Sequence, residues 1–332
     1  MATAQRLHQP GPIESRPLKP WEPPEEPLGP GEVEIAVASC AVCRTDLQIV
    51  EGDLAARRLP IVPGHQVVGR IVSVGSNVTD RQTGQRVGVA WLAGTCGVCR
   101  FCLSRRENLC ERATFTGWDR DGGFSTRMTA RSDFTFLLPD GGKDVDLAPL
   151  LCGGVIGFRS LKVAEIQPGQ RLGLFGFGAS ALLAIQVAVH WGCEVYVATR
   201  SAREQGRAIE FGAVWVGGYE DPIPAPLDAA ITFAPSGDVV VSALRSLDRG
   251  GTVAINAIHL DRIPEFPYEA LWWERRLRSV ANFTRRDAEE FLTLAKEIPI
   301  QTQPVEYRLS KANEALADLK AGRFTGAAVL VP

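Results

Sequence analysis

The segments "PGQRLGLFGFG" (168–178) and "ASALLAIQVAVHWG" (179–192) are adjacent and decide the fold. The first is an apolar run that ends in glycines, which predicts a buried strand and a tight turn, and the second has the apolar content of a helix. From Leu172 to Cys193 the chain has no Asp, Glu, Lys or Arg, and this stretch has the length of a membrane span. Its glycines and its change of period favour a buried strand–turn–helix over a membrane helix.

The turn "GFGASA" (176–181) fits G-x-G-x-x-A, a variant of the dinucleotide-binding pattern. The first glycine makes the tight turn, the second lets the backbone approach a pyrophosphate, and the alanine keeps the helix close to the strand. The N–H groups at the start of the helix then face the anion. The alternative is a tight turn without a ligand. The expected cofactor contacts here are Gly176, Gly178, Ala179, Ser180 and Ala181.

The next predicted strand, "CEVYVATRS" (193–201), carries a signal of cofactor specificity. An NAD site usually ends this strand with an acid that binds the ribose hydroxyls. Here Thr199 stands at that place, followed by Arg200 and Ser201. A neutral residue beside a guanidinium suits a 2′-phosphate, so we expect NADP(H) to be preferred over NAD(H). Alternatively, Arg200 is a solvated surface residue.

The two halves of the chain have different patterns. After residue 168 predicted strands and helices alternate, which indicates βαβ units and a doubly wound parallel sheet of the α/β class. Before residue 150, short β-rich segments such as "EVEIAVAS" (32–39) and "HQVVGRIVSVG" (65–75) are separated by Gly and Pro. They predict a partly open, barrel-like β unit. A length of 332 residues agrees with two domains.

Charge and cysteine usage exclude several classes of protein. A formal net charge of -2 gives no large field of one sign, so we expect no nucleic-acid or membrane partner. The N-terminal residues lack the pattern of a secretory signal, and the expected compartment is the cytoplasm. In such a chain, eight cysteines predict metal ligands rather than disulfides.

One cysteine cluster lies in "TCGVCRFCLSRRENLC" (95–110), with C-x2-C-x2-C-x7-C spacing. Four thiolates this close can bind one tetrahedral zinc ion with no open position, which makes a structural site. Iron–sulfur ligation shares part of this spacing, and four free thiols are the remaining alternative. The four candidate ligands are Cys96, Cys99, Cys102 and Cys110.

A second set is scattered along the chain. "ASCAVCRTDLQ" (38–48) holds Cys40 and Cys43, "PGHQVVG" (63–69) holds His65, and "LLCGG" (150–154) holds Cys152. One histidine and two cysteines would make the Cys₂His set of an open, catalytic zinc site. Cys40 and Cys43 alone would instead suit a redox dithiol. The remaining histidines, His8, His190 and His259, are interpreted as structural.

Several motifs occur together in this chain: "VCRTDL", "PGH", the four-cysteine cluster, "LLCGG", the glycine turn and the C-terminal "GRFTGAAVLV". With these motifs, the chain resembles zinc-dependent alcohol dehydrogenases of the medium-chain dehydrogenase/reductase superfamily. It looks most like the shorter bacterial and yeast-type enzymes. The resemblance implies a β-rich GroES-like catalytic domain at 1–153 and 286–332, with a structural-zinc lobe at 94–112. It implies a Rossmann domain at 154–285, and an assembly of identical chains, a tetramer or a dimer.

The family's roles carry over to matching positions. Cys43, His65 and Cys152 match the catalytic zinc ligands, and the four-cysteine cluster matches the structural zinc ligands, two zinc ions per chain in all. The other matches are Thr45 (proton relay), Asp46 (orienting the zinc-ligating histidine), Arg44 (cofactor pyrophosphate) and Trp91 (substrate pocket). Two positions depart from the pattern. Gln66 replaces an acid after the zinc histidine, and Gln48 replaces the histidine that often ends the relay.

The expected activity is therefore hydride transfer between NADP(H), or NAD(H), and a primary or secondary alcohol, an aldehyde or a ketone. An alternative is a zinc reductase of the same fold acting on a polyol or a conjugated aldehyde. Two further alternatives are a non-catalytic dinucleotide sensor, and a thiol redox switch at Cys40 and Cys43.

Overall fold

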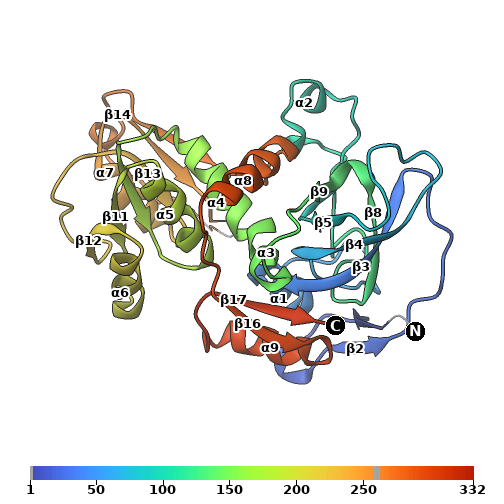
Figure 1. Cartoon of the computed structure of the whole chain (residues 1–332). Coiled ribbons are helices and arrows are strands. Elements are labelled where there is room, and N and C mark those ends of the chain that lie inside the picture. The colour runs from blue at the N-terminus through green and yellow to red at the C-terminus, as the bar shows by residue number, and fades with distance from the viewer. Residues whose placement is uncertain (1–2, 258–259, 261) are drawn as a thin grey trace. The chain divides into compact units, whose positions relative to one another are not determined.

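The computed structural model describes residues 3–257, 260 and 262–332 (Figure 1), so His259 lies outside the described residues. The chain divides into two compact units. The first comprises Met1–Cys152, Asn282–Lys296 and Gln301–Pro332, and the second comprises Gly153–Ala281 and Glu297–Ile300. Sequence reasoning places the boundaries after 153 and before 286, and it gives no sign that Glu297–Ile300 belongs with the second unit.

The first unit is built on a mainly antiparallel sheet in the order β16-β17-β3-β4-β5-β9, with β8 also paired to β3. Only β16 and β17 pair in parallel within it. The strands are β3 (Glu32–Ala41), β4 (Val67–Val74), β5 (Arg86–Val89), β8 (Arg127–Arg131), β9 (Thr135–Leu137), β16 (Pro304–Arg308) and β17 (Ala327–Val331). The predicted β-rich unit is therefore present.

Smaller elements complete the first unit. Two short antiparallel pairs are β1 (Ala4–Leu7) with β2 (Leu18–Trp21), and β6 (Leu92–Gly94) with β7 (Thr114–Phe115). The helices are α1 (Arg44–Glu51), α2 (Arg100–Leu103), α3 (Asp144–Leu147), α8 (Arg285–Glu297) and α9 (Ala312–Lys320).

The core of the first unit follows from the alternation along β3. Val33, Ile35 and Val37 are buried, while the residues between them are half-buried, as the period of a strand requires. These side chains pack with Phe124 and with apolar residues of β4 and α1. The result is a rigid platform on which the loops after β3 and before β4 are held.

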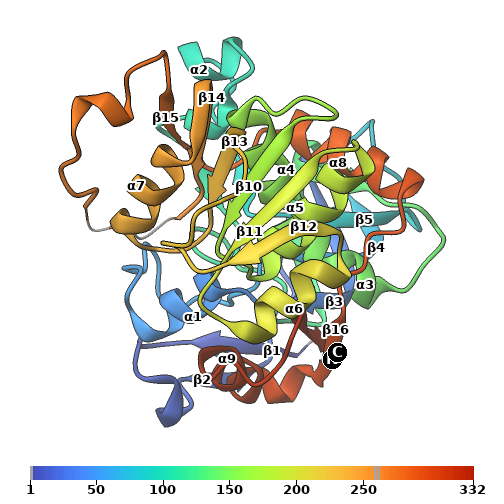
Figure 2. The ribbon, with the colours of Figure 1, turned by 90° about the vertical axis from the view of Figure 1, so that its left-hand side faces the viewer.

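The second unit is a six-stranded sheet in the order β12-β11-β10-β13-β14-β15, in which every pair is parallel (Figure 2). The strands are β10 (Arg171–Phe175), β11 (Glu194–Ala198), β12 (Ala213–Gly217), β13 (Leu227–Thr232), β14 (Leu247–Ile255) and β15 (Arg276–Ser279). The helices are α4 (Gly153–Ala164), α5 (Ala179–His190), α6 (Ala202–Glu210) and α7 (Gly237–Arg245). The predicted doubly wound parallel sheet is confirmed.

The strand order of the second unit reverses beside β10, because the chain runs from β10 outward to β12 and then returns to β13 on the other side. Such a switch point is where doubly wound sheets bind ligands. The glycine turn 176–178 follows β10 directly. The stretch from Leu172 to Cys193 is β10 and α5, so its interpretation as a buried strand–turn–helix is confirmed.

One helical stretch of the described chain, Asp144–Ala164, is long and apolar enough to cross a membrane. Its apolar window is 67% buried inside the structure, as in a core helix. The stretch opens with Asp144 and Asp146, and a 3-10 turn, Ala148–Leu151, separates α3 from α4. These features favour a packed helix over a span.

Candidate metal centres and nucleotide site

The glycine turn has the geometry that its sequence predicts. Gly176 has φ of 94°, and a Cβ there would lie 2.9 Å from the backbone nitrogen of Ala234. Only glycine fits this position. Gly178 caps α5 in an extended conformation, and a Cβ there would meet nothing within 4 Å. The first N–H groups of α5, from Ala179 onward, have no partner within the helix and can bind an anion.

Thr199 follows β11 and is buried, but it does not stand alone as the sequence implies. Its hydroxyl donates to Oε2 of Glu204 at 2.5 Å, and its carbonyl accepts from Gln205 at 2.7 Å. Ser201 caps α6 and accepts from the N–H of Glu204 at 3.3 Å. Arg200 is exposed. Glu204 is thus an acid that sequence reasoning missed, although the S-x-x-E spacing of a helix start was a signal for it.

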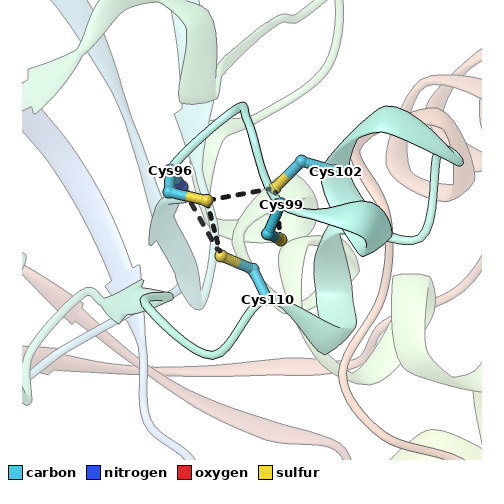
Figure 3. Close-up of side chains that lie close together, drawn as sticks. All are labelled: Cys96, Cys99, Cys102 and Cys110. Carbon is cyan, nitrogen blue, oxygen red and sulfur yellow. Dashed lines mark hydrogen bonds between the residues drawn. The ribbon is translucent and has the colours of Figure 1, made fainter.

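The four cysteines of the lobe converge (Figure 3). Their sulfur atoms all lie within 4.8 Å of one another. The Sγ–Sγ distances are 3.5 Å for Cys99 and Cys102, 3.6 Å for Cys96 and Cys110, and 3.9 Å for Cys96 and Cys102. A zinc ion with Zn–S bonds of about 2.3 Å requires tetrahedral edges of about 3.8 Å. All eight cysteines are free thiols, so this cluster fits a metal ion and contains no disulfide.

The surroundings of Cys96 favour its thiolate, whereas burial raises the pKa of Cys110 to about 11. Backbone N–H groups of Val98 and Cys99 outweigh desolvation and lower the pKa of Cys96 to about 6. Buried Glu107 accepts the backbone N–H of Arg285, at the start of α8, at 3.0 Å. Asn282 donates to the carbonyl of Asn108 at 3.4 Å. The lobe is therefore tied to α8, far away in the sequence, by contacts that sequence reasoning did not find.

The second cluster brings together Cys43, His65 and Cys152, whose ligand atoms also lie within 4.8 Å of one another. Cys43 caps the N-terminus of α1, and Cys152 ends the 3-10 turn after α3. His65 is buried and follows Gly64, whose φ of 101° and close contact with Phe124 exclude a side chain. Cys40 is buried on β3 and does not belong to the cluster.

Asp46 holds this cluster in place. The Nδ1 atom of His65 lies 2.9 Å from Oδ1 of Asp46, which also accepts the N–H of Gly64 at 3.1 Å. Oδ2 accepts the N–H of Cys43 at 2.8 Å. A carboxylate accepts a hydrogen bond from Nδ1–H, so the other ring nitrogen, Nε2, is left as the ligand atom. Burial lowers the pKa of His65, but Asp46 and Cys43 raise it to about 10 overall.

We predict that Asp46→Asn lowers the zinc affinity of this cluster by about 10- to 100-fold, because partners that orient a ligating histidine have effects of this size. The neutral amide can keep some hydrogen bonds but not the negative charge beside the ring. Competition with a zinc-binding dye measures the change. Asp53→Asn, at an exposed position just after α1, is the matched control and should leave the affinity unchanged. Equal affinities for the two variants would contradict the orienting role.

The remaining residues predicted from the sequence lie on α1 or, for Gln66, just before β4. Thr45 is on the first turn of α1, with its Oγ1 3.9 Å from Sγ of Cys43. Gln48 is one turn further, on the same side of the helix, and is half-buried. Arg44 is exposed at the start of α1. Gln66 is buried, and its carbonyl accepts the N–H of Ala41 at 3.0 Å.

Trp91 belongs to a group of stacked rings beside His65. Its ring lies edge-on to His65, with centroids 5.0 Å apart, and stacks with Phe115 at 5.0 Å and with Trp118 at 5.9 Å. The guanidinium of Arg57 lies 4.0 Å from the centroid of the Trp118 ring. The family resemblance assigned Trp91 to the pocket, and nothing in the sequence singled out Phe115.

Comparisons with known proteins identify the family of this chain. Residues 29–140 match the alcohol dehydrogenase GroES-like domain. A probable alcohol dehydrogenase AdhA of Mycobacterium tuberculosis is 47% identical, over 99% of this chain and 97% of its own length. An alcohol dehydrogenase of Geobacillus stearothermophilus is 31% identical, over 91% of this chain and 92% of its own.

Among solved structures, a cinnamyl alcohol dehydrogenase of Sorghum bicolor superposes with a TM-score of 0.89 at 25% identity, covering 99% of this chain and 97% of its own. The fold class is thereby confirmed as a GroES-like domain plus a Rossmann domain. With nearly full-length similarity at 47% identity, the chain belongs to the zinc-type, medium-chain alcohol dehydrogenase family.

Proposed function

We propose that this protein is a zinc-dependent alcohol dehydrogenase or aldehyde reductase that transfers hydride between NADP(H) and an alcohol, aldehyde or ketone. Family membership supports alcohol and aldehyde oxidoreduction. The observation that carries the zinc-dependent part is the convergence of Cys43, His65 and Cys152, with the ring of His65 fixed by Asp46. Three protein ligands leave a fourth tetrahedral position for a substrate oxygen.

A zinc ion bound there would supply a Lewis acid that stabilises an alkoxide, and a nicotinamide nucleotide would exchange the hydride. The chain's own residues do the rest. Cys43, His65 and Cys152 would hold the ion, and Asp46 keeps the His65 ring oriented. The Thr45 hydroxyl, close to the Cys43 sulfur, accepts the substrate proton and passes it on. Gln48 has no basic group at neutral pH, so the proton leaves through water.

The stacked rings of Trp91, Phe115 and Trp118 favour one substrate class over another. A flat aromatic or conjugated aldehyde stacks on such a surface, whereas a polyol would leave its hydroxyl groups without partners. Trp91 touches both this surface and His65. We therefore favour conjugated or aromatic aldehydes over polyols as substrates.

For the cofactor we propose NADP(H) in preference to NAD(H). The support is the turn from Gly176 to Ala181, at the switch point of the sheet, and the exposed guanidinium of Arg200 after the next strand. Arginine matches a 2′-phosphate in charge and in geometry.

We predict that Gly178→Ala folds like the wild type but binds NADPH about tenfold more weakly. Its backbone accepts alanine without a clash, but the added methyl group occupies the open space proposed for the pyrophosphate. Quenching of protein fluorescence by NADPH measures the affinity. Gly31→Ala, at an equally open position in the first unit, should change nothing. Unchanged NADPH affinity in Gly178→Ala would contradict the assignment of this turn.

The alternatives are less well supported. Burial raises the pKa of the Cys40 thiol well above its usual value, which makes Cys40 a poor partner in a redox switch with Cys43. A non-catalytic sensor does not need the complete set of Cys43, His65 and Cys152 that this chain keeps. We also propose a cytoplasmic homo-oligomer, a tetramer or a dimer, without a nucleic-acid or membrane partner. Light scattering tests the oligomeric state.

Initial rates test the proposed reaction. The zinc-loaded chain should oxidise NADPH in the presence of aromatic or conjugated aldehydes, more slowly with polyol-derived aldehydes, and not after zinc is removed. Rates that survive complete zinc removal would overturn the zinc-dependent mechanism. A faster reaction with NADH would overturn the cofactor preference.

A further inference from the structure

We propose that Glu204 opposes Arg200 at the nucleotide site, so that the chain discriminates only weakly between NADP(H) and NAD(H) and uses both. The inference rests on the proposed function, since it assumes that a nicotinamide nucleotide binds at the turn after β10. It identifies Glu204 as a residue that determines cofactor specificity.

Glu204 lies beside the part of the sheet where the nucleotide is proposed to bind. Strands β10 and β11 are neighbours, with Phe175 paired to Ala198. The N–H of Gly176 donates to the carbonyl of Ala198 at 2.8 Å. The glycine turn and Thr199 therefore leave adjacent strands at the same edge of the sheet. Because Thr199 donates to Glu204 at 2.5 Å, the carboxylate is held at that edge too.

Two further contacts hold the start of α6 close to Thr199. The backbone N–H of Glu204 is bound by the side chain of Ser201, which starts α6 at this point. The next residue, Gln205, donates to the carbonyl of Thr199 at 2.7 Å. Glu204 is half-buried, so its charge is only partly screened by water.

A cation, Arg200, directly follows Thr199 in the chain. The guanidinium of Arg200 lies 5.9 Å from the ring centroid of Tyr219. Burial raises the pKa of the Tyr219 hydroxyl, Thr199 and Arg200 lower it, and Glu204 raises it further. Arg200 and Glu204 thus act on one small region at the end of β11.

The two charges select for different nucleotides. A guanidinium attracts the 2′-phosphate of NADP(H) and can bind it through two hydrogen bonds. A carboxylate repels that phosphate, but it accepts hydrogen bonds from the ribose hydroxyls of NAD(H). Glu204 reaches the end of β11 from the first turn of α6. There it takes the role that usually belongs to an acid at the end of the strand itself. Together the two residues predict only a small difference between the affinities for NADP(H) and NAD(H).

Binding of nucleotide fragments separates this inference from catalysis. Calorimetry with adenosine 2′,5′-bisphosphate and with 5′-AMP reports the effect of the 2′-phosphate without any hydride transfer. We expect Glu204→Gln, which can still accept from Thr199, to raise the affinity ratio of the bisphosphate to AMP by about tenfold. Arg200→Gln should lower the same ratio by about tenfold. Glu210→Gln, at the exposed far end of α6, is the control and should leave the ratio unchanged.

The ratio of NADPH affinity to NADH affinity should likewise rise in Glu204→Gln, fall in Arg200→Gln and stay unchanged in Glu210→Gln. An unchanged ratio in Glu204→Gln, with both fragments binding the wild type, would overturn the role of Glu204 and leave the proposed function intact. If neither fragment nor either nucleotide binds the wild type, the proposed nucleotide site itself is wrong. Equal shifts in Glu204→Gln and Glu210→Gln would show a general charge effect and would also overturn the inference.

Discussion

Cys152→Ser should abolish the catalytic metal site and lower kcat/KM for aldehyde reduction by about a thousandfold or more. Cys152 supplies one of only three converging ligands, and hydroxyl oxygen is a poor replacement for thiolate at zinc. Stabilisation of charge by the metal is worth several kcal/mol, and each 1.4 kcal/mol is about tenfold in rate. Zinc content should fall by one ion per chain. Because Cys152 forms no disulfide, its loss should not unfold the chain.

Cys193→Ser is the matched control for this prediction. Cys193 is a buried cysteine outside both clusters, and its sulfur lies 3.5 Å from the carbonyl of Gln167, a contact that serine can keep. Rate and zinc content should stay at wild-type values. If Cys152→Ser keeps both its zinc and its rate, Cys152 is not a ligand.

Cys99→Ser should have its main effect on stability. It removes one of the four sulfur ligands in the lobe, so the zinc ion of the lobe should be lost. The zinc ion at Cys43, His65 and Cys152 should stay bound. Structural zinc ions contribute directly to folding free energy. If the first unit loses about 3 kcal/mol, its unfolding temperature falls by about 10 °C. Because Glu107 and Asn108 tie the lobe to the start of α8, the loss should spread beyond the lobe.

Calorimetry with zinc quantitation measures this effect. Leu103→Ser, a highly exposed position in the same lobe, should change neither the zinc content nor the unfolding temperature. Hydrogen exchange should show faster opening at the N-terminus of α8 only in Cys99→Ser. Wild-type thermal stability in a Cys99→Ser chain that lacks the zinc ion of the lobe would show that the lobe contributes nothing to folding.

The sequence predicts the parts of this structure that depend on local pattern. The glycine turn and the parallel sheet follow from apolar periods and from glycine positions that the backbone requires, as at Gly176. The four-cysteine lobe follows from close spacing, because ligands within one short loop can meet without help from the rest of the fold. Cys43, His65 and Cys152 are distant in the sequence. Their residue types suit a Cys₂His set, and the family resemblance assigned all three to one site.

Other features could not be predicted because they depend on how loops meet. The stacking of Trp91 with Phe115 and Trp118 joins the residue before β6 to β7 and the loop after it, and no period in the sequence marks it. The residues at the end of β11 place Thr199 where an acid is usual, but Glu204 reaches Thr199 from α6. The strand residues alone cannot predict a side chain that reaches back from the next helix.

The two clusters, Cys43–His65–Cys152 and the four cysteines of the lobe, are expected to bind one zinc ion each. Elemental analysis of the wild-type chain, saturated with zinc and freed of excess metal by gel filtration, should therefore find two zinc ions per chain. One zinc ion or none per chain would contradict this expectation.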